Sequence, residues 1–92
     1  MKPMSAYGVV HYLLRKQRGS ASKHWCVDCG KPALHWAYDH RDVFERFDAD
    51  SMQVFSVNFD HYRPMCVPCH ARLDIANAAR VREALADLAR AG

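Results

Sequence analysis

Two Cys-x-x-Cys pairs constrain the fold more than any other feature of this chain: Cys26/Cys29 and Cys66/Cys69. Four thiolates arranged as two short-range pairs supply the donors that a tetrahedral zinc site requires. Each pair occupies a tight turn, so a zinc ion bound by both pairs would cross-link the N-terminal third of the chain to its centre. The sequence therefore predicts a structural Zn²⁺ held by all four cysteines.

The length of the chain makes such a cross-link important for stability. With 92 residues, the chain is expected to form a single domain spanning 1–92. A domain of this size buries only about 60–65% of the surface that its unfolded chain exposes. A structural zinc contributes on the order of 10 kcal/mol to folding, comparable to the whole net stability of an ordinary domain. We therefore expect folding to depend on the metal.

A disulfide or a thioredoxin-like redox pair is the alternative to a metal site. Residues 1–18 contain no uninterrupted apolar run and no small-residue cleavage site, so we expect no secretory signal. No apolar run approaches the roughly 20 residues that a membrane span needs. We expect a cytoplasmic protein, and in a reducing compartment Cys-x-x-Cys pairs favour metal binding over disulfides.

The rest of the chain predicts a mixture of helices and short strands. Ser5 can cap a helix over about 5–18, whose last turn is basic. The first knuckle (residues 23–31) contains Gly30, which supplies backbone freedom. We predict strands over 34–40 and 61–65, a loop with one helical turn over 41–58, and a long helix over about 70–90.

The order of these elements resembles the HNH endonuclease family. The matching residues are Asp39-His40 at the end of the first strand, His61 shortly before the second knuckle, and His70 at the start of the last helix. Members of the family carry a ββα-metal motif (also called a His-Me finger) that is cross-linked by a four-cysteine zinc. The resemblance spans roughly Lys23 to Asp74.

This resemblance implies a small α+β domain of the zinc-stapled ββα-metal type. The core would span about 23–75, between the N-terminal helix and the long C-terminal helix. Small phage-borne HNH proteins share the layout, so the resemblance also implies a phage origin and a location in the host cytoplasm. The implied activity is hydrolysis of phosphodiester bonds in DNA by a divalent-metal-dependent endonuclease.

The resemblance also implies a role for each polar residue of the motif. Asp39 and His70 would bind a catalytic divalent metal (Mg²⁺, Mn²⁺, Ni²⁺ or Zn²⁺), and His40 would be the general base. Adjacent strand residues point to opposite faces, so Asp39 and His40 cannot easily bind one ion together. A carboxylate suits a hard cation, and a neutral imidazole suits proton transfer near pH 7. Asp74 lies four residues after His70 on the same helix face and is a further candidate ligand.

The chain departs from the family pattern at two places. His61 stands where the family has an Asn that braces the loop between the strands, and we include it among the catalytic-site residues because an imidazole can also donate and accept hydrogen bonds. Asn58, three residues earlier, could take over this role. The apolar residue and Pro that commonly follow the first His of the family are replaced by Arg41-Asp42. These departures leave a second hypothesis open: a catalytically silent, zinc-stabilised nucleic-acid-binding or regulatory module.

Charge patterning bears on partners. Basic residues outnumber acidic ones over 1–31 and over 61–92, acidic residues predominate over 32–60, and the net charge is +3. Basic flanks around a metal-binding centre suit a polyanion such as DNA, although ordinary solvated surfaces give the same pattern. The C-terminal helix could also pack on a second copy, forming a homodimer, or on a phage or host protein. A protein-interaction zinc module is a third hypothesis, and it predicts no salt-sensitive affinity for DNA.

Overall fold

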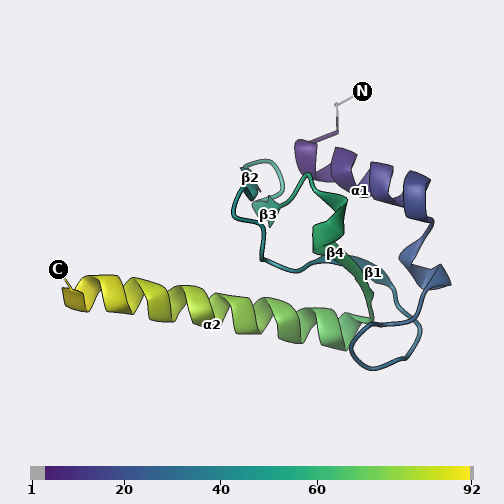
Figure 1. The fold of residues 1–92 in the computed structure, drawn as a ribbon. Coiled ribbons are helices and arrows are strands. Elements are labelled where there is room, and N and C mark those ends of the chain that lie inside the picture. Colours follow the sequence, from purple (N-terminus) through teal and green to yellow (C-terminus); the bar gives the residue numbers. More distant parts are fainter. Residues whose placement is uncertain (1–3, 92) are drawn as a thin grey trace.

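The computed structural model describes residues 4–91 and has an α+β architecture. Two helices accompany two small antiparallel sheets, one formed by β1 and β4 and the other by β2 and β3 (Figure 1). The elements are α1 (Ala6–Arg18), β1 (His35–Tyr38), β2 (Arg46–Asp48), β3 (Gln53–Phe55), β4 (Tyr62–Met65) and α2 (Val67–Ala91). The α+β class agrees with the sequence-based prediction, which lacked the second sheet.

Helix α1 begins and ends where local chemistry dictates. The Ser5 hydroxyl oxygen accepts a hydrogen bond from the backbone N–H of Gly8 at 3.1 Å, which caps the first turn. Gly19 has φ 83° and donates its N–H to the Arg15 carbonyl at 2.9 Å, so the chain leaves the helix there. The predicted N-terminal helix is confirmed within its stated bounds.

The larger hydrophobic core lies between α1 and both sheets. Leu14 is fully buried on α1, and Phe55 is 2% exposed on β3. The Trp36 indole N–H donates to the Gly19 carbonyl at 3.0 Å, which ties β1 to the end of α1. The buried members of this core are Val10, Leu14, Ala21, Trp36, Tyr38, Phe55 and Tyr62.

A second, smaller core surrounds the cysteines on the other face of the β1–β4 pair. Ala37 lies between Trp36 and Tyr38 on β1 and faces the cysteines because successive strand residues point to opposite faces. Its buried members are Cys26, Ala37, Met65, Cys66 and Cys69, with Leu73 packed against them. Apart from sulfur, this half of the molecule has little buried apolar volume.

The two main strands are shorter than predicted. Strand β1 pairs with β4 from His35↔Met65 to Tyr38↔Tyr62, so Asp39 and His40 lie just beyond the strand. The chain turns sharply at His40, which has φ 62°. At the same end of the sheet, a 3₁₀ turn over Phe59–His61 leads into β4, so His61 precedes β4 and does not belong to it. The catalytic candidates therefore lie at the end of the sheet.

The segment 41–58 corrects the prediction of a loop with one helical turn. It contains the β2–β3 hairpin, paired from Arg46↔Phe55 to Asp48↔Gln53. The hairpin turn places Met52 at φ 57°, and the Ser51 hydroxyl donates to Asp48 at 2.6 Å within it. Phe55 is buried against α1, and this contact packs the hairpin onto the larger core.

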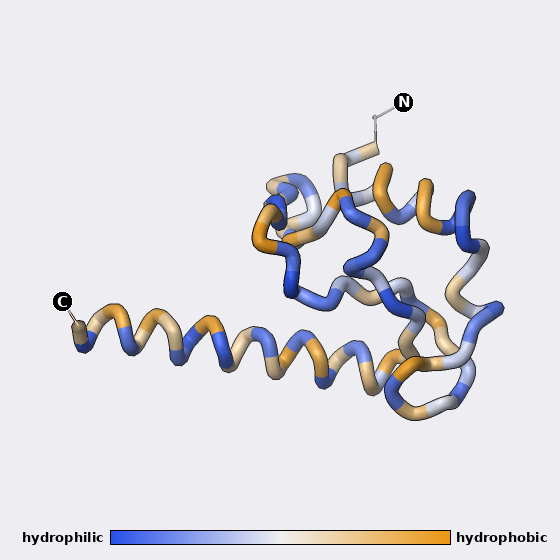
Figure 2. The backbone as a smooth tube through the Cα atoms, viewed as in Figure 1, coloured by the Kyte–Doolittle hydropathy of each residue, from blue (hydrophilic) through white to orange (hydrophobic). Residues whose placement is uncertain are grey.

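Helix α2 begins at Val67, three residues before the predicted start, and runs to Ala91. Its first turns contact β1, and the remainder projects away from the rest of the molecule (Figure 1). Figure 2 shows apolar positions recurring along this projecting part. Val81, Leu85 and Leu88 are 50%, 61% and 69% exposed. Packing of α2 on a second copy or another protein stays a prediction.

Within residues 4–91, neither helix combines the length and apolar character required to cross a membrane.

Candidate functional site

The four cysteines form a compact cluster of sulfur atoms. Their Sγ atoms all lie within 4.8 Å of one another, and those of Cys29 and Cys66 are 3.6 Å apart. Two sulfurs bound to one tetrahedral zinc at 2.3 Å lie about 3.8 Å apart. All four cysteines are free, so no disulfide of the kind that the redox alternative would allow is present among the described residues. The cluster could hold a metal ion such as zinc, as the sequence predicted.

The backbone of the first knuckle is shaped for this purpose. Gly30 has φ 76° and donates its N–H to the Cys26 carbonyl at 2.9 Å, which closes the turn. Val27 donates its N–H to the Pro64 carbonyl at 3.1 Å, which joins the knuckle to β4 just before the second cysteine pair. The two pairs thus meet through backbone contacts as well as through their side chains.

Electrostatics differ among the four sulfurs. Burial raises the pKa of Cys26, but backbone hydrogen bonds, that of Cys66 first, outweigh burial and lower it to about 6. Hydrogen bonding with Cys66 and burial raise the pKa of Cys69 to about 12. The Arg72 guanidinium donates to the Cys69 Sγ at 3.1 Å. Arg72 would stabilise negative charge on this sulfur in a metal-bound state.

A second polar cluster lies where β1, its following turn and α2 meet. We call His35, His40, His70 and Asp74 the Asp74 cluster. Asp74 Oδ1 is 2.8 Å from His40 Nε2, and Oδ2 is 3.4 Å from His70 Nε2. His70 Nδ1 is 3.0 Å from His35 Nδ1. One carboxylate therefore reaches two imidazoles that come from different segments, and a third imidazole contacts the second.

The Asp74 cluster offers imidazole nitrogens and one carboxylate, which are ligand types found at divalent-metal sites. Two oxygen or nitrogen ligands at adjacent positions of an octahedral ion lie about 3 Å apart, close to the 3.4 Å between Asp74 Oδ2 and His70 Nε2. His35 contacts the other ring nitrogen of His70, as the outer partner of a metal-binding histidine does. Among residues 4–91, only the cysteines gather three or more candidate ligand atoms, so the Asp74 cluster does not form a complete ligand set by itself.

The imidazole of His40 is nearly enclosed by its surroundings. Its side chain is 11% exposed, and its Nδ1 is buried without a hydrogen-bond partner among the described residues. In the neutral tautomer whose Nε2–H donates to Asp74, the lone pair lies on Nδ1. Burial lowers the pKa of His70, and His35 and His40 add to this effect, although Asp74 opposes it. A neutral His70 is the form that binds metals.

Asp39 and His61 form a separate pair. His61 Nδ1 lies 3.0 and 3.2 Å from the two carboxylate oxygens of Asp39, and the Asp39 N–H donates to the His61 carbonyl at 2.9 Å. Asp39 also accepts from the Arg41 N–H at 2.9 Å. The structure therefore brings His40, His70 and Asp74 together, whereas Asp39 bonds to His61 and to neither His70 nor Asp74. A metal-binding role for Asp39 stays a prediction.

The Asp74 cluster opens into a cavity of about 200 Å³ between α1, β1 and α2, with the β2–β3 hairpin at its edge. His11 of α1 lines this cavity and had no role predicted from the sequence. Burial lowers the pKa of His11, and the positive charges of Arg15, His70 and His35 lower it further. Its spacing of three residues from the apolar Leu14 was a signal that it lies near the inner face of α1.

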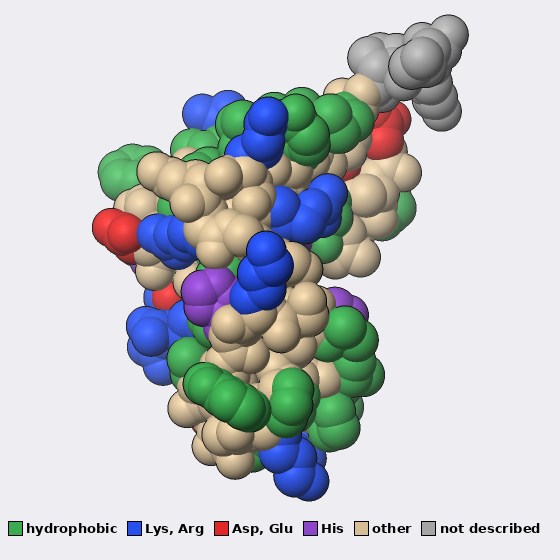
Figure 3. Space-filling view, turned by 90° about the vertical axis from the view of Figure 1, so that its right-hand side faces the viewer, with side chains coloured by type: hydrophobic (Ala, Val, Ile, Leu, Met, Phe, Trp, Pro, Cys, Tyr) green, Lys and Arg blue, Asp and Glu red, His purple; other side chains and the backbone are tan. Residues whose placement is uncertain are grey.

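His35, like His11 and His24, had no role assigned from the sequence. It begins β1, opposite Met65 of β4, and its imidazole packs edge-on against His70 at 5.1 Å between ring centroids. On the face of the molecule at the end of α1, basic side chains are more prominent than acidic ones (Figure 3). The site thus combines imidazoles and one carboxylate.

Comparisons of the chain with protein-family models, with curated proteins and with solved structures gave no significant match.

Proposed function

We propose that this protein is a divalent-metal-dependent endonuclease of the HNH type that hydrolyses phosphodiester bonds in DNA, with a structural zinc at the four cysteines. The observation that supports it best is the Asp74 carboxylate, which reaches His40 at 2.8 Å and His70 at 3.4 Å beside an open cavity. A base, a hard-metal ligand pair and room for a phosphate are what hydrolysis of this bond requires.

His40 is the general base in this proposal. Asp74 Oδ1 accepts the Nε2 proton and fixes the tautomer, in the way that a carboxylate orients the histidine of a hydrolytic triad. The Nδ1 lone pair is buried and has no hydrogen-bond partner among the described residues, so a side-chain movement that exposes it to the cavity would let it take a proton from a water molecule. His70 Nε2 and Asp74 Oδ2 would hold a divalent ion, which supplies positive charge to the phosphate and to the departing 3′ oxygen.

The Asp39–His61 pair has a positioning role. Its two contacts join the turn after β1 to the turn before β4. Because His40 directly follows Asp39 and has φ 62°, holding this turn orients the imidazole toward Asp74. The resemblance implies that Asp39 also binds the ion. The Asp39 carboxylate would then have to bind the metal while it accepts the hydrogen bond from His61.

Cleavage of supercoiled plasmid by zinc-loaded protein tests the proposal. Mg²⁺, Mn²⁺ and Ni²⁺ are each added, and His40→Ala is compared with the parent. Loss of a general base is expected to slow cleavage by about 10²–10⁴-fold. Asp74→Asn should behave similarly, whereas Asp87→Asn, the same change on the exposed distal part of α2, should retain the parent rate. Equal cutting by His40→Ala and the parent would refute the role of His40.

The silent nucleic-acid-binding module is the second candidate, and one observation favours it. His61 occupies the position of the family's Asn and holds Asp39 in a bidentate contact, which keeps that carboxylate from an ion. This candidate predicts DNA affinity that falls steeply with salt but no cleavage with any of the three metals.

A further inference from the structure

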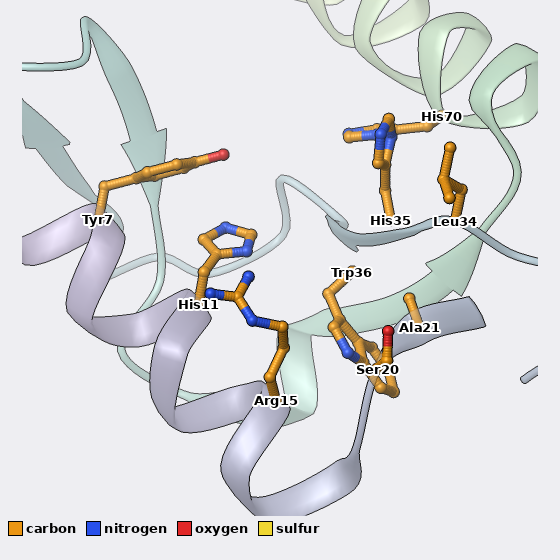
Figure 4. A pocket seen from close by; sticks show the side chains of 9 residues that line it. All are labelled: Tyr7, His11, Arg15, Ser20, Ala21, Leu34, His35, Trp36 and His70. Carbon is orange, nitrogen blue, oxygen red and sulfur yellow. The ribbon is translucent and has the colours of Figure 1, made fainter. Parts of the chain in front are cut away.

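A second cavity, of about 260 Å³, lies between α1 and the start of β1 (Figure 4). It is open to solvent and combines a guanidinium, imidazoles and hydroxyl groups. Its polar lining consists of Tyr7, His11, Arg15, Ser20, His35 and His70.

The lining contains no carboxylate. Arg15 forms no salt bridge within residues 4–91, although acidic side chains pair with other basic groups there. Figure 4 shows Arg15 and His11 projecting from α1 into the space that His35 and His70 face from the opposite wall. An arginine fork without an acidic partner, next to imidazole nitrogens, is suited to a bidentate bond with a phosphate.

This cavity adjoins the one beside the Asp74 cluster. His11, Trp36 and His70 line both, so an anion held by Arg15 lies next to the cluster. A nucleic-acid backbone carries one phosphate per nucleotide at a regular spacing, and neighbouring phosphates would enter neighbouring cavities. Contacts of this kind fix the register of the backbone without reading the bases.

We propose that the cavity between α1 and β1 binds the backbone phosphate next to the one that is cleaved, with Arg15 as its principal ligand and His11 and His35 as further donors. The statement that the neighbouring phosphate is the one cleaved rests on the proposed function. The binding of a backbone phosphate by Arg15 does not depend on it. The subsite belongs to α1, which lies outside the ββα core.

Binding of a short DNA duplex to the His40→Ala protein tests the subsite without hydrolysis. Arg15→Gln is compared with Lys16→Gln, which removes the same charge from the next residue. The Lys16 ammonium lies over the Tyr12 ring, 5.7 Å from its centroid, and is not part of the cavity. Arg15→Gln should weaken binding about tenfold and reduce the slope of log K against log salt by about one. Lys16→Gln should change affinity by less than about twofold.

Two results would overturn the subsite: no effect of Arg15→Gln, or equal weakening by both substitutions, which would indicate a general charge effect. Arg15→Lys should weaken binding to an intermediate degree, because the charge remains and the fork is lost. Thermal melting of each variant checks the fold, which an exposed substitution on α1 should leave intact.

A duplex with one neutral methylphosphonate, moved along the strand, locates the contact. In protein with Arg15, one position should weaken binding, and Arg15→Gln should abolish the difference between this duplex and the normal one. If no position along the strand shows this coupling, the proposed subsite is refuted. An Arg15-dependent position without cleavage by the parent would refute the proposed function alone. Cleavage by the parent with no Arg15-dependent position would refute the subsite alone.

Discussion

Removal of a metal bound by the four cysteines should unfold the cysteine-bearing half of the molecule, which comprises the first knuckle, the end of β4 and the start of α2. The cluster joins Cys29 to Cys66, which are 37 positions apart in the chain. In the chain-entropy model, a cross-link that closes a loop of this length removes about 4 kcal/mol of conformational entropy from the unfolded state. Small domains have net stabilities of about 5–15 kcal/mol, so this one constraint decides whether the half is folded.

The surrounding packing cannot replace the cross-link. Apart from the cysteines, the buried members of the smaller core are Ala37 and Met65, with Leu73 packed at its edge. Burying a Met or Leu side chain contributes only about 1.5–3 kcal/mol. Without a metal, the cysteine thiols also lose the ion that would hold them within 4.8 Å. We therefore expect a free-energy difference of at least about 4 kcal/mol between the zinc-loaded and metal-free proteins.

Urea unfolding, followed by tryptophan fluorescence and far-UV circular dichroism, measures this difference. One sample is loaded with one equivalent of zinc and the other is treated with a chelator under reducing conditions. Cys29→Ser should behave like the chelated protein, whereas Val27→Ser, an exposed position in the same knuckle, should behave like the parent. The same unfolding midpoint and slope with zinc and with chelator would refute the account of the cysteine cluster.

Three further changes test particular contacts. Arg72→Gln removes the donor to Cys69 Sγ and should weaken zinc binding about tenfold, measured by competition with a chelator. Leu14→Ala, at a fully buried position on α1, should destabilise the zinc-loaded protein by about 3–5 kcal/mol in urea unfolding, and an unchanged midpoint would contradict the assigned core. A hydrogen bond from Ser56 lowers the pKa of Asp42 below its ordinary 3.8. This bond therefore stabilises the fold above pH 3.8, and its contribution is lost as the pH falls through the folded-state pKa of Asp42. Ser56→Ala should therefore move the acid-unfolding midpoint to higher pH, and a midpoint that stays in place or falls would show that the bond contributes little.

The sequence predicted the features that depend on spacing alone. The two cysteine pairs, the Ser5 cap and the basic last turn of α1 are local patterns with a direct physical cause, and each has its predicted place. Adjacent residues were expected to face opposite ways at the end of the first strand. Asp39 and His40 do contact different partners, His61 and Asp74.

The features that the sequence did not predict depend on backbone conformations without a local signal. The turn between β2 and β3 uses Met52 at φ 57°, where glycine or asparagine would have indicated a hairpin. His40, at φ 62°, leaves the strand by a turn that no neighbouring glycine marks. The roles of His11 and His35 depend on how α1 packs against β1 and α2, which periodicity within one helix cannot reveal.

Titration of Mn²⁺ into zinc-loaded protein, followed by calorimetry, tests the central claim most directly. A metal-dependent nuclease centred on Asp74 predicts one Mn²⁺ site in addition to the zinc, absent in Asp74→Asn and retained in Asp87→Asn. The absence of any Mn²⁺ binding by the parent protein would contradict it, as would binding that Asp74→Asn leaves unchanged.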